Sequence, residues 1–217
     1  MRFDIHTHQS TLDDEIAIAI RSLYSDFAKA ASGLVCSIGL HPWYLDDHER
    51  LFVELELYAG LPNVLAIGEC GLDKVCETDW NLQVAVFKRQ ITLANRMNKP
   101  LIIHCVRAFE ELIKIIEEAK PTVPVVVHGF NKKSTVADRF IEHGMYLSFG
   151  AAILNRESPA AAALQRIPAD QFFLETDNSD VPIGEMYKAA AEIRQIDEEA
   201  VILQMQQNFN TVFKYNK

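Results

Sequence analysis

Short apolar runs alternate with longer amphipathic segments along almost the whole chain. Eight runs have the length and composition of strands, and stretches such as 80–98 and 107–120 have the spacing of amphipathic helices. The runs lie at 2–6, 15–21, 34–40, 64–69, 100–104, 123–128, 145–149 and 171–175. Strands that alternate with helices are typical of a parallel sheet covered by helices. Eight such units predict an α/β fold of the TIM-barrel type.

The connection between the first two runs is unusually short. Parallel strands need a crossover of about a dozen residues or more, and the segment 7–15 is too short to contain a full helix. We therefore predict a (β/α)8-like barrel that is trimmed near its first two strands. No linker, repeat or low-complexity tract interrupts the pattern, so residues 1–217 are predicted to form a single domain.

Composition narrows the class of protein further. The chain is 49% hydrophobic and 24% charged, which is typical of a globular protein. It contains no apolar run long enough for a membrane span, no signal-peptide pattern at residue 1 and no CxxC pair among its four cysteines. These features predict a cytoplasmic protein that does not associate with a membrane. The net charge of −9 disfavours a general affinity for nucleic acid, because phosphate backbones are bound mostly by lysine and arginine.

Polar residues stand at the ends of most of the predicted strands. In a TIM barrel the carboxyl ends of all strands open at one mouth, where the active site lies. Two of these residues, His6 and His8, are separated by one residue, so a strand presents both imidazoles on one face. The residues at the predicted strand ends are His6, His8, His41, Glu69, His104, His128, Glu175 and Asp177.

Together, these histidines and carboxylates indicate a metal site. A single histidine at a strand end is more often a hydrogen-bonded structural residue than a ligand. Several imidazoles and carboxylates buried together without a cation, however, would be desolvated at a cost of several kcal/mol. Mixed nitrogen and oxygen ligands suit Zn²⁺, Mn²⁺ or related divalent ions. We therefore predict a metal site at the barrel mouth.

An ordered set of motifs resembles a known family. The stretches FDIHTH, GLHPW, AIGECGLD, LIIHCVRA, VVVHGF, LSFG and FLETD occur in that order. They are similar to the motifs of the TatD-type metal-dependent deoxyribonucleases, a branch of the amidohydrolase superfamily, and they cover nearly the whole chain. The chain departs from that pattern in the short segment between FDIHTH and GLHPW. It departs again after FLETD, where the usual proline is replaced and the following loop is shortened.

The resemblance implies a particular ligand set and reaction. It implies that His6, His8 and Asp177 hold one divalent ion, that His104 and His128 hold a second, and that Glu69 bridges the two. The ions would be Zn²⁺, Mn²⁺ or Mg²⁺. The implied substrate is a phosphodiester in DNA, attacked by a water that the two ions activate. Asp177 would take the proton from that water, so Asp177 and Glu69 are the predicted catalytic residues.

Further residues near the mouth receive supporting roles. Glu175 shares a strand face with Asp177 and is predicted to support a histidine ligand. His41 is predicted to line the mouth without binding metal. Arg107 is a candidate contact for a substrate phosphate, although a salt bridge at the start of its helix is an equal alternative. Lys132 is a weaker candidate, because exposed lysines are usually only solvated.

Three other functions remain open from the sequence. A C–N hydrolase of the same superfamily is disfavoured by Glu69, because many such enzymes have a carbamylated lysine at that strand. A phosphoesterase for small molecules is favoured by the charge of −9 and the shortened loops. A non-enzymatic metal-binding protein would have lost a ligand, whereas every expected position is filled. The predicted partner is DNA or another phosphoester at the mouth, with no obligate protein partner.

Overall fold

The computed structural model describes residues 2–9 and 16–214. The chain divides into two compact units, which we describe separately. The terminal unit contains the residues up to Ile20 and those from Val127 onward, and the central unit spans Arg21–Val126. The prediction of a single domain stays a prediction.

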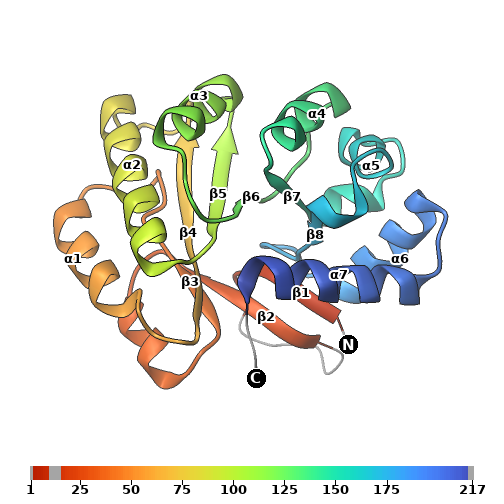
Figure 1. Cartoon of the computed structure of the whole chain (residues 1–217), viewed down its shortest axis with the longest axis horizontal. Coiled ribbons are helices and arrows are strands. Elements are labelled where there is room, and N and C mark those ends of the chain that lie inside the picture. Colours follow the sequence, from red (N-terminus) through yellow and green to blue (C-terminus); the bar gives the residue numbers. More distant parts are fainter. Residues whose placement is uncertain (1, 10–15, 215–217) are drawn as a thin grey trace. The chain divides into compact units, whose positions relative to one another are not determined.

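The strands form one eight-stranded sheet in chain order, β1 to β8 (Figure 1). Within the described residues, every predicted strand is present at nearly its predicted position, which confirms the TIM-barrel-type α/β fold class. The short connection predicted after β1 lies mostly outside the described residues. The strand bounds are β1 Arg2–Thr7, β2 Ile16–Leu23, β3 Cys36–Ile38, β4 Val64–Asp73, β5 Leu101–Val106, β6 Val125–Val127, β7 Tyr146–Phe149 and β8 Phe172–Leu174.

Helices follow most of the strands, as the amphipathic segments predict (Figure 1). The α2 helix begins after Asp79, whose side chain caps it by accepting a hydrogen bond from Leu82 N, and ends at Asn98 in the left-handed region. Among the described residues, no helix is long and apolar enough to cross a membrane. The α-helices are α1 His48–Tyr58, α2 Trp80–Met97, α3 Phe109–Ala119, α4 Ser134–Glu142, α5 Pro159–Leu164, α6 Ile183–Arg194 and α7 Glu198–Phe213, and the 3₁₀ helices are η1 Phe27–Ser32, η2 Ala151–Leu154 and η3 Ala169–Gln171.

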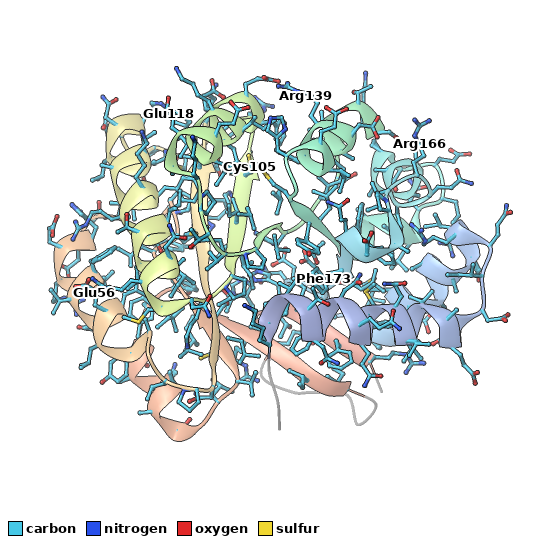
Figure 2. The ribbon with its side chains drawn as sticks, viewed as in Figure 1. Glu56, Cys105, Glu118, Arg139, Arg166 and Phe173 are labelled. Carbon is cyan, nitrogen blue, oxygen red and sulfur yellow. The ribbon has the colours of Figure 1, made fainter. Side chains whose placement is uncertain are left out.

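In the terminal unit, the first and last strands of the sheet order lie together. Thr7 forms a bridge with Asp177, just beyond β8. The ring of Phe3 on β1 packs against that of Phe209 on α7, with centroids 4.6 Å apart and an interplanar angle of 30°. The side chain of Phe173, labelled in Figure 2, is fully buried and continues this core. Burial of these aromatic side chains holds β1, which carries the first predicted ligands, against β8 and α7.

In the central unit, β4 and β5 form a parallel pair whose register places Gly71 opposite His104. Gly71 has a φ of 140°, and a Cβ atom there would lie 2.1 Å from the backbone oxygen of His104. Only glycine permits this close approach. The buried side chain of Gln90 on α2 accepts from Leu40 N and donates to Leu40 O, which fixes the start of the loop after β3.

Candidate metal centre

The terminal unit contains a cluster formed by His6, His8 and Asp177, here called the His6 cluster. The Nε2 atoms of His6 and His8 lie 3.7 Å and 3.6 Å from Asp177 Oδ1. These distances exceed a hydrogen bond. They are close to the ~3.4 Å that separates neighbouring ligand atoms around a tetrahedral ion with bonds of ~2.1 Å. Two imidazole nitrogens and a carboxylate oxygen converging in this way fit a divalent transition-metal ion.

Backbone pairing positions the three members of the His6 cluster. His8 N donates to Asp177 O at 3.0 Å, and Asp177 N donates to His6 O at 2.9 Å. Asp177 adopts a φ of 52°, in the left-handed region, which turns the chain as it leaves β8. Its side chain remains 37% exposed, whereas that of His6 is fully buried. The carboxylate therefore lies beside the imidazoles and can also contact water.

A buried carboxylate beneath this cluster supports the same pairing. Asp4 Oδ2 accepts from the Thr176 hydroxyl at 2.6 Å, and Oδ1 accepts from Thr176 N at 3.1 Å. The Thr176 hydroxyl also lies 2.8 Å from the Thr7 hydroxyl. Burial raises the pKa of Asp4 to about 7, although the hydrogen bonds from Thr176 act in the opposite direction. Asp4 thus joins β1 to the segment that carries Asp177.

His128 and Glu175 also lie in the terminal unit. The ring of His128 is 4.2 Å from the ring of His6, and its Nδ1 is 3.5 Å from Glu175 Oε1. The same Glu175 oxygen accepts from Gly129 N at 2.7 Å. Burial raises the pKa of Glu175, but the neighbouring imidazole of His128 outweighs it and holds that pKa below its usual range. This contact is the one expected of a carboxylate that supports a histidine ligand.

The central unit contains a second cluster, formed by His41, Glu69 and His104 and here called the His104 cluster. Glu69 Oε1 lies 3.1 Å from His41 Nε2 and 3.0 Å from His104 Nδ1. On its other side, His104 Nε2 lies 2.9 Å from Asp73 Oδ2. A neutral imidazole has only one N–H, so one of these two contacts would set a nitrogen lone pair against a carboxylate oxygen. Protonation of both ring nitrogens, or a metal ion bound between His104 Nδ1 and Glu69, removes this clash, and the donor set fits a metal ion.

Asp73 is a site residue that the sequence analysis missed. It is buried and accepts from Trp43 Nε1 at 2.6 Å, from His104 Nε2 and from Val75 N at 2.7 Å. Burial raises the pKa of Asp73, but the hydrogen bonds from Trp43 and His104 outweigh it, so that pKa lies below its ordinary value. An ionised Asp73 accepts the Nε2 proton of His104, so Nδ1, which faces Glu69, is the ring nitrogen whose lone pair can bind a metal ion.

The hydrogen bonds of His41 favour a supporting role over a ligand role. Its Nδ1 accepts from the backbone N–H of Trp43 at 3.1 Å. The proton of the neutral ring is therefore assigned to Nε2, which donates to Glu69. That His41 lines the site without binding metal stays a prediction.

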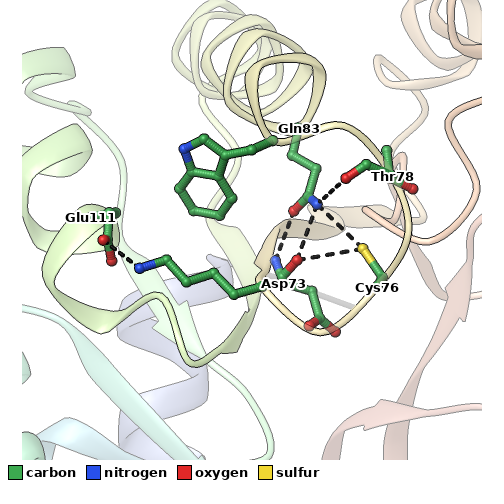
Figure 3. Close-up of a pocket in the computed structure, with 7 residues that line it drawn as sticks. Asp73, Cys76, Thr78, Gln83 and Glu111 are labelled. Carbon is green, nitrogen blue, oxygen red and sulfur yellow. Dashed lines mark hydrogen bonds and ion pairs between the residues drawn. The ribbon is translucent and has the colours of Figure 1, made fainter.

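A cavity of about 370 Å³ lies behind Asp73 (Figure 3). The buried side chain of Gln83 accepts from Asp73 N at 2.8 Å and donates to Asp73 O at 3.0 Å and Thr78 O at 2.9 Å. The side chains of Lys74 and Glu111 form an ion pair at its edge. Gln83 therefore fixes the end of β4 at Asp73, and Asp73 fixes the orientation of His104.

Several predicted roles rest on residues that these contacts do not test. Arg107 follows β5 and Lys132 precedes α4, and both side chains are exposed. Their contact with substrate stays a prediction. The shared ion of His104 and His128, and the bridging role of Glu69, also stay predictions.

Comparison with known proteins identifies the family. A family model described as TatD related DNase matches residues 14–214. A protein of Haemophilus influenzae named as an uncharacterized metal-dependent hydrolase is 30% identical over 69% of this chain and 61% of its own length. A 3'-5' ssDNA/RNA exonuclease TatD of Edwardsiella piscicida is 32% identical over 74% of this chain and 62% of its own length. The chain thus spans about three fifths of these relatives.

A solved structure supports the fold along the whole chain. The crystal structure of YjjV, a TatD homologue from Escherichia coli K12, matches with a TM-score of 0.88 at 23% identity. The match covers 99% of this chain and 98% of the other. Together with the family model, the ligand clusters and the fold lead to one conclusion: the chain belongs to the TatD-related DNase family.

Proposed function

We propose that this chain is a metal-dependent nuclease that hydrolyses phosphodiester bonds in nucleic acid. The observation that carries the proposal is the convergence of imidazole and carboxylate atoms in the His6 and His104 clusters. Each cluster is supported by a buried carboxylate, Asp4 in one and Asp73 in the other. A protein that merely retained the fold would have no reason to gather so many imidazole and carboxylate groups in buried positions next to one another.

The proposed ligands are those implied by the sequence: His6, His8, Glu69, His104, His128 and Asp177. Divalent ions at such sites neutralise charge on a phosphate and lower the pKa of a water molecule. Asp73 keeps His104 in the tautomer that presents Nδ1, and Glu175 orients His128. His41 donates to Glu69 and fixes the direction of its carboxylate.

Asp177 is the proposed general base. Its carboxylate lies beside His6 and His8 but is more exposed than either imidazole, so a water molecule can reach it. A nearby cation keeps a carboxylate ionised at neutral pH, which leaves it able to accept a proton. Asp177 takes the proton of the attacking water and returns a proton to the leaving oxygen.

The name of the Edwardsiella piscicida relative supports a single strand of DNA or RNA as the substrate. The net charge of −9 leaves few cationic side chains for long stretches of phosphate backbone. Nucleic-acid contact is therefore proposed to be local to the metal centre. The same charge also favours a second candidate function, hydrolysis of small phosphoesters.

One set of assays tests the proposal and separates the two candidates. Purified protein is supplied with Zn²⁺, Mn²⁺ or Mg²⁺ in turn and incubated with single-stranded DNA, single-stranded RNA, duplex DNA and small phosphomonoesters. We expect metal-dependent cleavage of a single strand, abolished by a chelator and by His6→Ala. Leu203→Ala, an exposed substitution on α7, is the control expected to retain activity. Cleavage of small phosphoesters alone would support the second candidate, and turnover of no phosphoester would contradict both.

A further inference from the structure

Three large aromatic side chains are exposed together in the central unit. Tyr24 is 40% exposed, Trp43 is 53% exposed and Tyr44 is 47% exposed. Tyr24 directly follows β2, and the other two lie in the loop after β3. Because β2 and β3 are parallel neighbours, both loops leave the same edge of the sheet (Figure 1). In barrels of this type, that edge carries the active site.

The three rings, here called the aromatic surface, lie against one another. Tyr24 and Tyr44 are stacked with centroids 4.9 Å apart and an interplanar angle of 27°. Trp43 meets Tyr44 edge-on at 6.3 Å. Large aromatic side chains gain free energy when they are removed from water. A group of them left exposed side by side is therefore typical of a binding surface.

The aromatic surface is continuous with the His104 cluster. The ring of Trp43 lies 5.1 Å from that of His41 and 6.0 Å from that of His104. Its Nε1 donates to Asp73, the same carboxylate that accepts from His104. Tyr44 N donates to His41 O at 3.0 Å. The Trp43 ring and the Tyr44 backbone are therefore anchored to the metal-site residues before any ligand binds, which lowers the entropy cost of binding.

We propose that Tyr24, Trp43 and Tyr44 stack the bases of the nucleic-acid strand whose phosphodiester is hydrolysed, an inference that rests on the proposed function. The occupant must sit next to the candidate metal centre, so it is the substrate itself. Stacking uses the uncharged faces of the bases, which suits a chain with a net charge of −9. It accepts every base and requires unpaired ones, because the bases of a duplex already stack on each other.

The test measures binding separately from turnover. A fluorescent single-stranded oligonucleotide with phosphorothioate linkages, which resist hydrolysis, is titrated with the full chain in the presence of divalent metal. An abasic strand of the same length and linkage is titrated in parallel. We expect Tyr24→Ala and Tyr44→Ala to weaken binding of the base-carrying strand by at least ~5-fold, the lower limit of a base–aromatic stack. Binding of the abasic strand should change little.

Two kinds of control make the result specific. Tyr24→Phe and Tyr44→Phe keep the ring and should retain binding, and circular dichroism confirms that each variant is folded. Leu57→Ala, an exposed substitution on α1 of the same unit, should bind as the unchanged protein does.

Three outcomes would overturn the inference: an unchanged protein that does not bind the base-carrying strand, alanine variants that bind each strand as tightly as the unchanged protein does, or alanine substitutions that change the oligomeric state and not strand binding. The last result would show that the aromatic surface joins two copies of the chain. Base-dependent binding without hydrolysis of any natural strand would refute the proposed nuclease function and leave the stacking surface in place.

Discussion

Replacing Asp73 with asparagine tests whether the His104 cluster is built around a metal ion. The Asp73 carboxylate accepts three hydrogen bonds: Oδ2 from Trp43 and His104, and Oδ1 from Val75 N. The side-chain amide has nearly the same shape but only one accepting oxygen. Whichever way it is oriented, its NH₂ group faces at least one N–H group across a contact that is now repulsive.

The expected effect follows from these contacts. A buried donor left without an acceptor costs about 1–3 kcal/mol, so the free energy of unfolding should fall by that amount. Loss of the negative charge also removes the group that holds the Nε2 proton of His104. Metal affinity should therefore fall by ~10–100-fold, the usual effect of removing a carboxylate that supports a histidine ligand.

The assay combines urea unfolding with competition between the protein and a chromogenic chelator for Zn²⁺. Glu111→Gln is the matched control, because Glu111 lines the cavity behind Asp73 and its carboxylate forms an ion pair with Lys74 at the cavity edge. It should leave metal affinity unchanged. A metal affinity for Asp73→Asn equal to that of the unchanged protein, with stability alone reduced, would refute the role of Asp73 in orienting His104.

Three further predictions address the base, the substrate contact and the pH dependence of stability. Asp177→Asn should lower phosphodiester turnover by ~10²–10⁴-fold, as expected for loss of a general base. The amount of bound metal should fall far less than in His6→Ala. Near-normal turnover with metal bound would show that another residue is the base. The logarithm of the affinity for single-stranded DNA should depend only weakly on the logarithm of the salt concentration, because few phosphates are neutralised. A slope near −10, which is that of an extended basic interface, would contradict local binding. Burial raises the pKa of Tyr187, whose hydroxyl donates to Phe3 O and accepts from Phe3 N, above its ordinary value of 10.0. The unfolded tyrosine then loses a proton that the folded one keeps, so the free energy of unfolding should fall as the pH rises above about 10. Urea unfolding should show that the free energy of unfolding falls less with rising pH in Tyr187→Phe than in the unchanged protein. The same fall in both proteins would show that Tyr187 is not the group responsible.

The strand pattern could be read from the sequence because buried parallel strands appear as short apolar runs. The limit of this reasoning is visible in β4. The apolar run ends at Glu69, so the strand was expected to end there, whereas it continues to Asp73. The continuation contains Gly71 and a carboxylate, neither of which favours a strand by propensity. Pairing with β5 imposes the extended conformation on these residues.

The same residues explain what was missed in the site. Glu69, Gly71 and Asp73 alternate along β4, so a longer strand would have placed both carboxylates on one face. The link from Asp73 to His104 could then have been predicted. By contrast, the contact between Tyr24 and Tyr44 joins two loops and has no periodic signal in the sequence. The tautomer of His41 depends on a backbone N–H in a turn, which the sequence pattern also does not specify.

The central claim is that the His6 and His104 clusters bind the divalent metal on which hydrolysis depends. The most direct measurement is metal stoichiometry, determined by elemental analysis after equilibration with Zn²⁺ and gel filtration, for the unchanged protein, His6→Ala and His104→Ala. We predict that the unchanged protein retains metal and that each histidine variant loses metal together with activity on a single strand. A protein that retains no metal, or histidine variants that keep its full stoichiometry and activity, would contradict the claim.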